Sequence, residues 1–291
     1  MAHNGNQVSK STPTDGVLVI GGGVAGVQAS LDLAKAGAHV YLVERTPSVG
    51  GRMAQLDKTL PTNDCSICIL SPLLVEALRH ENIDLLTYSE VISLSGQSGS
   101  FRATILRKSR YIKESECVGC GVCARKCPVT VPNEFDMGLG ERKAIYVPFQ
   151  QATPLVYTID PTSCLNFKNG KFQKVCTKCE EACPRGAVDF TLKDERIEVD
   201  VGAVIVATGF DEIDASRIRN LGYGECEDVL TGLEFERLLN AAGPTGGKVL
   251  RRSDSRKPSS IAFVQCVGSR DEKYRPYCSR VCCVYSIKQC M

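Results

Sequence analysis

The sequence of 291 residues is long enough for one large domain or two smaller ones with a sizeable core. Its hydrophobic content of 43%, charged content of 23% and net charge of +2 give no indication of a nucleic-acid or membrane surface. No apolar run approaches the roughly 18–20 residues that span a bilayer. Sixteen cysteines without an export signal favour thiols or metal ligands in a reducing cytoplasm over disulfide bridges.

A polar tail, residues 1–14, opens the chain; it lacks the apolar stretch of a signal peptide and predicts a disordered arm. A complete β-α-β unit follows the tail. The β-branched run 16–22 predicts a buried strand, 24–37 has helical periodicity, and 39–44 predicts a second strand that ends in an acid. The glycines between the first strand and the helix have G-x-G-x-x-G spacing: Gly21, Gly23 and Gly26.

This β-α-β unit predicts a dinucleotide site. The glycines permit a tight turn and a close approach of the backbone, and the helix N-terminus faces a pyrophosphate. Glu44 stands 18 residues after Gly26, where an acid can accept hydrogen bonds from a ribose. A turn used only for packing explains the glycines but leaves Glu44 unexplained.

Two further stretches bear on which dinucleotide binds. A Gly-Gly-Arg step stands at 50–52, and the apolar run 201–210 predicts a strand that closes on Ala-Thr-Gly at 207–209. With these stretches the chain resembles the thioredoxin-reductase-like flavoproteins, which have two dinucleotide-binding domains. The resemblance implies that the first fingerprint binds FAD rather than NAD. The further FAD-site residues that it implies are Gly50, Gly51, Arg52, Thr208 and Gly209.

Cys65 and Cys68 lie in the stretch TNDCSICILSP (62–72), just before a predicted helix at 73–80. A C-x-x-C pair at a helix start has the spacing of a redox disulfide, because thiols in that position are activated. Two other interpretations stay open: half of a metal site, or small buried residues of the core.

Two cysteine runs predict iron–sulfur clusters. The run CVGCGVCARKCP (117–128) has the spacing C-x2-C-x2-C-x3-C-P, the bacterial ferredoxin signature of [4Fe–4S] clusters. The second run keeps the C-x2-C-x3-C-P ending, but 11 residues, 165–175, follow its first cysteine, with a hairpin tip predicted at Asn169-Gly170. In two-cluster ferredoxins the fourth cysteine of each run reaches the other cluster. The predicted ligand sets are therefore Cys117, Cys120, Cys123 and Cys183 for one cluster, and Cys164, Cys176, Cys179 and Cys127 for the other.

Iron–sulfur ligation is favoured over zinc, because zinc sites pair two C-x2-C knuckles across a longer spacer or include histidine. The ferredoxin-like block, residues 111–188, lies between the Gly-Gly-Arg and Ala-Thr-Gly segments of one flavin domain. It is therefore an insertion anchored at both ends. Such an anchor fixes the distance between clusters and flavin better than a flexible linker does. We infer that electrons move between the clusters and FAD.

A further cysteine set lies near the C-terminus, where a strand is predicted at 260–264 and a helix is expected to place two cysteines one turn apart. Four thiolates from the strand end and the helix make a third candidate [4Fe–4S] site; the alternative is a helix with buried thiols. The four are Cys266, Cys278, Cys282 and Cys283. No second G-x-G-x-x-G follows the predicted strand, which argues against direct NAD(P)H binding. Cys226 and Cys290 receive no role.

The stretches 62–72, 117–128 and 263–283 (FVQCVGSRDEKYRPYCSRVCC) resemble the A subunit of heterodisulfide reductase. Members of that family are longer, so the resemblance predicts an N-terminal fragment or a truncated reading frame of a cytoplasmic protein. It implies a multi-subunit complex in which FAD takes electrons from a hydrogenase-type or formate dehydrogenase-type partner and divides them between ferredoxin and a disulfide-type acceptor. The alternatives are an A-like subunit of a quinone-linked membrane complex in sulfur metabolism, and an inactive electron-carrier fragment.

The predicted fold is α/β: a Rossmann-like, thioredoxin-reductase-like FAD-binding domain interrupted by an inserted α+β two-cluster ferredoxin-like domain. After the tail at 1–14, the FAD domain is expected at 15–110 and 189–258, with the insertion at 111–188. Residues 259–291 are expected to start a second nucleotide-binding-like domain.

Overall fold

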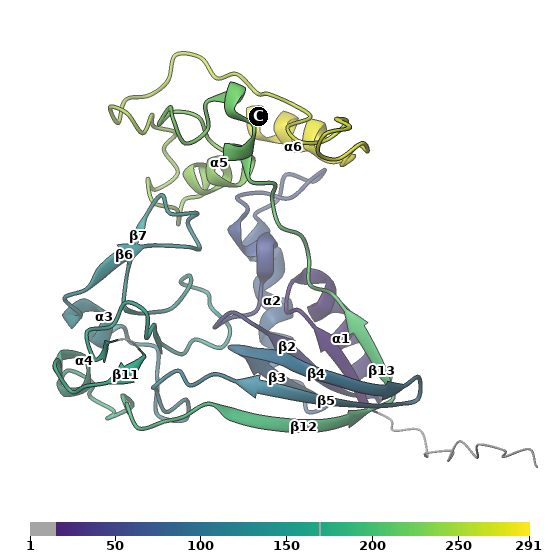
Figure 1. Ribbon diagram of the computed structural model, residues 1–291, viewed down its shortest axis with the longest axis vertical. Helices are drawn as coiled ribbons and strands as arrows, with labels where there is room; N and C mark the ends of the chain where they lie inside the picture. Colours follow the sequence, from purple (N-terminus) through teal and green to yellow (C-terminus); the bar gives the residue numbers. More distant parts are fainter. Residues whose placement is uncertain (1–15, 169) are drawn as a thin grey trace, which may run out of the picture.

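The computed structural model describes residues 16–291 with the exception of residue 169. The predicted tail, 1–14, and the predicted hairpin-tip residue Asn169 lie outside the described residues. Figure 1 shows two sheets at the bottom, a loop-rich region at the left and two helices at the top. Among the described residues, no helix is long and apolar enough to cross a membrane.

The first sheet is parallel, with strand order β13-β1-β2-β3. Its strands are β1 (Gly16–Ile20), β2 (His39–Glu44), β3 (Ile83–Thr87) and β13 (Ala203–Val206), and helix α1 (Val24–Lys35) connects β1 to β2. The predicted β-α-β unit is therefore present. The interior of β1 is buried on both faces, which explains its unbroken apolar run. The core on one face includes Val19, Val27, Leu31, Leu42, Leu70 and Leu74.

Helix α2 spans Ser66–Arg79, so the helix predicted at 73–80 starts earlier than expected. Pro72 lies inside α2, where a proline removes one backbone hydrogen bond. Leu70, Leu74 and Ala77 are fully buried in the same core. The predicted start was wrong because the helix buries one apolar face on both sides of Pro72, and this burial offsets the missing bond.

A second, antiparallel sheet covers the other face of the parallel sheet. Its strand order is β12-β5-β4, with β4 at Ser89–Gln97, β5 at Ser100–Arg107 and β12 at Glu195–Val201. Leu18 and Val43 of the parallel sheet share a buried cluster with Ala103, Ile105 and Val199 of this sheet. β12 pairs with β5 from Glu195 opposite Arg107 onward. The chain therefore leaves the flavin domain after β5 and returns along the neighbouring strand.

The region between β5 and β12 has little regular structure. It contains α3 (Val122–Lys126), α4 (Lys178–Glu181) and three two-stranded ribbons. The ribbons are β6 (Thr130–Pro132) with β7 (Glu141–Lys143), β8 (Ile145–Tyr146) with β9 (Thr158–Ile159), and β10 (Phe167–Lys168) with β11 (Lys171–Phe172). Its own small core includes Ile112, Ile145, Val156, Ile159, Val188 and Phe190.

The top of the molecule in Figure 1 contains α5 (Gly232–Leu239) and α6 (Cys282–Cys290). Three single-turn 3-10 segments also occur: η1 (Gly51–Gln55), η2 (Ala215–Arg217) and η3 (Arg219–Leu221). A buried ion pair between Lys288 and Glu236 joins α6 to α5. The same Glu236 accepts a 2.9 Å hydrogen bond from the backbone of Asp57. The two helices are therefore attached to the segment that follows η1.

The strand predicted at 260–264 is absent: this segment has no strand structure, and no described residue pairs with it. Ile261 and Val264 are 49% and 62% exposed. A β-strand needs a neighbour to satisfy its backbone groups, and a β-branched sequence alone does not supply one.

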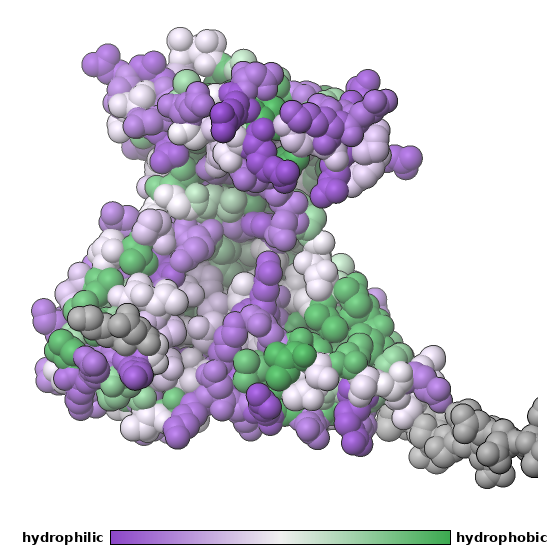
Figure 2. All heavy atoms as spheres, in the orientation of Figure 1, coloured by the Kyte–Doolittle hydropathy of each residue, from purple (hydrophilic) through white to green (hydrophobic). Residues whose placement is uncertain are grey.

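On the face drawn in Figure 2, hydrophilic residues cover much of the top, while hydrophobic ones gather at the lower right, near β13 and α1 in Figure 1. Val206 of β13 is 70% exposed and Val24 of α1 is 42% exposed. β13 is an edge strand, because only β1 pairs with it among the described residues. The apolar surface therefore continues to an open sheet edge.

Candidate FAD and iron–sulfur sites

The glycine loop between β1 and α1 is shaped by close contacts. A Cβ on Gly26 would lie 1.9 Å from the carbonyl oxygen of Gly21, and a Cβ on Gly21 would lie 2.3 Å from that of Ala207. Around Gly23, by contrast, the nearest atom to an added Cβ is 4.0 Å away. No protein contact therefore requires a glycine at Gly23, which is the N-cap of α1. An open backbone at a helix N-terminus fits the pyrophosphate of a dinucleotide.

Glu44 lies at the end of β2 and is 7% exposed. Its Oε2 accepts a 2.7 Å hydrogen bond from the backbone nitrogen of Gly22, and its Oε1 accepts one of 2.7 Å from Thr46. A carboxylate has about four acceptor positions, so Glu44 both fixes the glycine loop and retains acceptor capacity for ribose hydroxyls.

The other segments predicted for FAD meet at this loop. Gly50 donates a 2.7 Å backbone hydrogen bond to Gly22, and a Cβ on Gly51 would lie 2.9 Å from Cα of Gly23. The Ala-Thr-Gly segment also lies there: Ala207 donates to Ile20 at 2.8 Å. Ligands of open α/β sheets bind at the carboxyl ends of the strands, and these segments meet at that end of β1.

The remaining predicted FAD-site residues lie close by. Arg52 in η1 approaches Asp211, beyond the end of β13, with Nη2 to Oδ1 at 3.3 Å. Cα of Thr208 lies 3.1 Å from the Cβ position of Gly21, and Gly209 has a positive φ of 73°. The structure therefore places the predicted glycines up to Gly51, Glu44 and Thr208 in or against one loop, with Arg52 directly after Gly51.

The first predicted ligand set surrounds a cavity in the inserted region. Cys117, Cys120, Cys123 and Cys183 all line this cavity of about 340 Å³, its open mouth included. Gly119 and Gly121 have positive φ angles of 67° and 73°, which lets the loop turn sharply around the space. Cys183 arrives from the second cysteine run, after α4.

The second predicted set surrounds a matching cavity. Cys127, Cys164, Cys176 and Cys179 all line a space of about 350 Å³, its open mouth included. Asn166, only 1% exposed, connects the two ends of the 11-residue spacer: its Oδ1 accepts from the backbone nitrogens of Val175 at 3.0 Å and Cys176 at 2.7 Å. Its Nδ2 donates to the carbonyl of Cys176 at 2.7 Å. We did not predict a role for Asn166 from the sequence.

Each cavity offers four cysteines, the number of ligands that a [4Fe–4S] cluster takes. A four-iron cube keeps its four ligands apart by its own width, whereas zinc draws four sulfurs to about 2.3 Å from one centre. Burial raises the pKa of Cys123 and that of Cys179 to about 12, so these thiols are neutral until a metal displaces their protons.

Two family descriptions match the chain at these places. Residues 16–65 match the family described as FAD dependent oxidoreductase, and residues 110–131 match a 4Fe-4S binding domain. The first range contains the glycine loop and Glu44, and the second contains the first cysteine run. The chain is therefore an iron–sulfur flavoprotein, with FAD and [4Fe–4S] as its cofactors.

Curated relatives extend over nearly the whole chain. The A subunit of the H(2):CoB-CoM heterodisulfide,ferredoxin reductase of Methanothermobacter marburgensis is 52% identical over 97% of this chain and 42% of that protein. The iron-sulfur A subunit numbered 2 of the CoB--CoM heterodisulfide reductase of Methanopyrus kandleri is 55% identical over 94% and 41%.

The chain belongs to the A-subunit family of heterodisulfide reductase. It spans about two fifths of the length of these relatives. The A subunit of the ferredoxin:CoB-CoM heterodisulfide reductase of Methanosarcina mazei is more distant, with 47% identity over 96% of this chain. The family expected from the three cysteine-containing stretches is thus confirmed, as is the predicted combination of a Rossmann-like FAD domain and a ferredoxin-like region.

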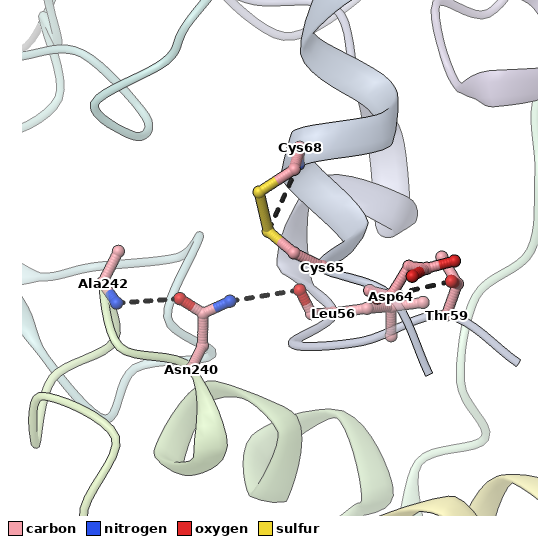
Figure 3. The surroundings of a disulfide bond; sticks show 7 residues. All are labelled: Leu56, Thr59, Asp64, Cys65, Cys68, Asn240 and Ala242. Carbon is pink, nitrogen blue, oxygen red and sulfur yellow. Dashed lines mark hydrogen bonds between the residues drawn. A yellow bond between two sulfur atoms is a disulfide. The ribbon is translucent and has the colours of Figure 1, made fainter. Parts of the chain in front are cut away.

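The Cys65–Cys68 pair of this heterodisulfide reductase A-family chain is a disulfide (Figure 3), and both residues are exposed. The interpretation that they are small buried core residues is therefore wrong. Cys65 is the N-cap of α2, and its Sγ accepts the backbone N–H of Cys68 at 3.3 Å. The core positions of α2 are taken by leucines and alanine instead, so the cysteines remain at the solvent end of the helix.

The C-terminal cysteine set differs from its expected secondary structure. Cys278 precedes α6 and is exposed, so it does not share a helical face with Cys282. Cys282 and Cys283 form the start of α6, and Cys266 has a positive φ of 58° in an irregular segment. The expected helix is shorter because residues 271–281 form turns, including a bridge between Asp271 and Arg275.

Proposed function

We propose that this chain is the electron-transferring flavoprotein core of a heterodisulfide reductase-like complex. The observation that carries the proposal is the pair of cavities, each lined by four cysteines drawn from both runs, in a region inserted next to the glycine loop. The proposed FAD-binding residues are Gly21, Gly23, Gly26, Glu44, Gly50, Gly51, Arg52, Thr208 and Gly209. The proposed cluster ligands are Cys117, Cys120, Cys123 and Cys183, and Cys127, Cys164, Cys176 and Cys179.

In this function the protein binds FAD and the clusters, holds them apart and shields them from water. FAD supplies the exchange of electron pairs with a donor, and the clusters supply one-electron steps. The glycine loop presents the backbone N–H groups of α1 to the pyrophosphate, and Glu44 orients the ribose. In each cavity the four cysteine thiolates would hold the cluster, and apolar residues around them, such as Ile145 and Val188, limit access of water.

The names of the relatives indicate the reaction class. One from Methanococcus maripaludis is the A subunit of an H(2)/formate:CoB-CoM heterodisulfide,ferredoxin reductase. By analogy, the proposed partners are a hydrogenase-type or formate dehydrogenase-type donor, ferredoxin, and a subunit that reduces a disulfide, all in the cytoplasm. Division of electrons between ferredoxin and the disulfide is part of this proposal.

A third [4Fe–4S] cluster at Cys266, Cys278, Cys282 and Cys283 is a separate proposal. Cys282 and Cys283 begin α6, which the Lys288–Glu236 pair attaches to the segment after η1. All four lie in turns or irregular segments or at the start of α6. Cys226 and Cys290 are exposed and stay without a proposed role.

The test is anaerobic reconstitution followed by iron, sulfide and flavin assays on one sample. Two cubanes predict about eight irons and eight sulfides per chain, and the third set raises the count to about twelve. One FAD per chain is expected. Zinc without sulfide would contradict the cluster proposal, and iron–sulfur without flavin would support the electron-carrier alternative. Electron transfer from a hydrogenase-type donor, assayed in the full complex, tests the proposed partners.

A further inference from the structure

Tyr157 lines the first cysteine cavity, immediately before β9. Its hydroxyl oxygen lies 2.8 Å from the Cβ position of Gly121, whereas Cζ of its ring lies 3.7 Å from that position. The hydroxyl end of the side chain therefore points at Gly121, which stands between the predicted ligands Cys120 and Cys123. Gly121 has a positive φ of 73°, so glycine serves both the turn of the loop and the close approach of the phenol.

The hydroxyl of Tyr157 is not used within the protein. Among the described residues it makes no hydrogen bond, whereas the hydroxyls of three other tyrosines donate to protein oxygens: Tyr223, Tyr274 and Tyr285. A tyrosine hydroxyl that is removed from bulk water usually has a partner. Burial raises the pKa of the Tyr157 phenol, and the nearby Cys123, Cys120 and Cys117 act in the same direction. The hydroxyl is therefore a protonated donor beside the first ligand set.

The backbone on both sides of Tyr157 is fixed by packing. The next residue, Thr158, is fully buried, and its hydroxyl accepts the 2.7 Å hydrogen bond from Arg110. Two residues before Tyr157, Leu155 packs against the first cysteine loop, where a Cβ on Gly119 would lie 2.8 Å from its Cγ. A side chain on such a fixed segment loses little conformational entropy when it forms a hydrogen bond.

The second cavity has no equivalent donor. Among the described residues that line it, none is a tyrosine, serine or threonine, and Ile145 and Ile159 stand beside its cysteines. Its polar lining residues are Asn166, whose Nδ2 donates to the carbonyl of Cys176, and the exposed Lys178. The two ligand sets thus have the same number of cysteines but different surroundings. Hydrogen bonds to the sulfurs are among the factors that set the reduction potential of an iron–sulfur cluster.

We propose that the hydroxyl of Tyr157 donates a hydrogen bond to a cysteine sulfur of the first [4Fe–4S] cluster and thereby raises the reduction potential of that cluster. The inference rests on the proposed function, because it requires the first ligand set to hold a cluster. Reduction adds one negative charge, so a donor that faces a ligand sulfur stabilises the reduced form more than the oxidised form. Tyr157 thus adds a difference between the two clusters that the cysteine spacing does not encode.

The test is an anaerobic redox titration of the reconstituted chain, followed by EPR spectroscopy, with iron and sulfide counted on the same sample. Tyr157→Phe keeps the ring and removes only the donor. We expect this variant to shift the reduction equilibrium of one cluster roughly tenfold toward the oxidised form, which is a decrease of about 59 mV for a one-electron couple. Every other cluster should keep its potential, and the iron and sulfide contents should equal those of the parent chain.

Tyr146→Phe is the matched control. Tyr146 lies in β8, opposite Thr158, and is not among the described residues that line either cavity, so the loss of its hydroxyl should change no potential. Three results in Tyr157→Phe would overturn the assignment: unchanged potentials, equal shifts in all clusters, or a loss of iron. These results leave the parent chain's clusters in place and do not bear on the proposed function. A parent chain that holds no iron and sulfide would instead overturn the proposed clusters, and this inference with them.

Discussion

Asn166 shows how one side chain can compensate for an unusual cysteine spacing. The spacer between Cys164 and Cys176 turns back through the β10–β11 ribbon, and Asn166 closes its base with three hydrogen bonds to Val175 and Cys176. Because the side chain holds both the N–H and the C=O of Cys176, that cysteine returns beside Cys164 at the rim of the second cavity.

Replacing Asn166 with alanine should therefore impair the second cavity alone. We expect Asn166→Ala to lose about half of the iron of the two ferredoxin-like clusters, about four of eight atoms, because only one ligand set depends on the clamp. Iron and sulfide assays and the EPR spectrum of the reduced protein measure this loss. Gln173→Ala, an exposed position in the same spacer, is the matched control and should keep all iron. Equal loss from both clusters would contradict a local role.

Two different constraints require glycine in the loop between β1 and α1. Gly21 and Gly26 are required by protein contacts at 2.3 and 1.9 Å, whereas Gly23 faces no atom closer than 4.0 Å. Spacing predicted all three glycines, but it could not separate those that shape the loop from the one that leaves room for a ligand. Gly21 is constrained by Ala207, which lies far along the chain, whereas Gly26 is constrained by the carbonyl of Gly21.

At the scale of elements, α5 joins three parts of the chain. Arg237 is 2% exposed; its Nε lies 3.0 Å from Oδ1 of Asp136 in the inserted region, and its Nη1 donates to the carbonyl of Gln55 at 2.8 Å. The neighbouring Glu236 contacts the segment after η1 and Lys288 of α6. Adjacent charged residues of one short helix thus hold the flavin-domain loop, the insertion and the C-terminal helix together.

We expect Arg237→Met to destabilise the fold by about 3–5 kcal/mol, because it leaves Asp136 buried without its charged partner. Anaerobic thermal and urea unfolding, followed by circular dichroism, measures the change. Adding Asp136→Asn should recover part of the loss by removing the uncompensated charge. Arg256→Met, at a side chain that is 82% exposed, should change stability by less than about 0.5 kcal/mol. A similar loss in both single variants would rule out this explanation.

Glu212 connects the start of α5 to the segment after β13. Burial raises the pKa of its carboxyl group, although hydrogen bonds from the backbone of Leu233 and the hydroxyl of Thr231 act in the opposite direction. A raised pKa in the folded state means that the protonated form is favoured by folding. The protonated carboxyl group therefore contributes to stability at a pH below its pKa in the unfolded chain. This contribution is lost as the pH rises through its pKa in the folded protein.

Glu212→Gln, which resembles the protonated form, should therefore gain stability relative to the parent chain as pH rises from the ordinary pKa of a glutamate through the raised pKa of Glu212. The difference in melting temperature between the two proteins, measured across this range, should grow with pH and then level off. Glu227→Gln, at an exposed acid, provides the control and should show no such trend. A difference that shrinks with rising pH would show that burial does not dominate at Glu212.

For the whole molecule, the central feature is how firmly the insertion is attached. Arg110 lies at its entrance and is 3% exposed. Its Nη2 donates to the carbonyl of Pro47 at 2.7 Å and to Oγ1 of Thr87 at 2.6 Å, and its Nη1 donates to Oγ1 of Thr158 at 2.7 Å. The guanidinium fork therefore connects the flavin domain to β9 of the inserted region.

Lysine at this position keeps the charge but cannot form the same fork. We expect Arg110→Lys to lower stability by about 2–3 kcal/mol and to increase limited proteolysis at the junction near residue 110. Cluster content should change little, because no ligand is moved. Arg102→Lys, whose arginine pairs with Asp200 on the surface, is the matched control. Unchanged proteolysis in Arg110→Lys would show that other contacts alone fix the insertion.

Short-range patterns in the sequence were enough to predict the β-α-β unit, the two ferredoxin-like runs and the family. The β-α-β unit and each cysteine run are short continuous stretches, and the family was indicated by three such stretches, within which spacing directly determines geometry. The helix start at Ser66 and the absent strand at 260–264 were not predicted correctly, because burial and strand pairing decided them.

The sequence by itself determined which chemistry the chain carries, since the glycine fingerprint and the cysteine spacing are local requirements of FAD and [4Fe–4S]. Only the tertiary structure decided how that chemistry is arranged. It brought Ala207 against Gly21, and it joined α5 to the inserted region and to α6 through Arg237 and Glu236. These arrangements depend on packing between distant segments, and no local spacing encodes such packing.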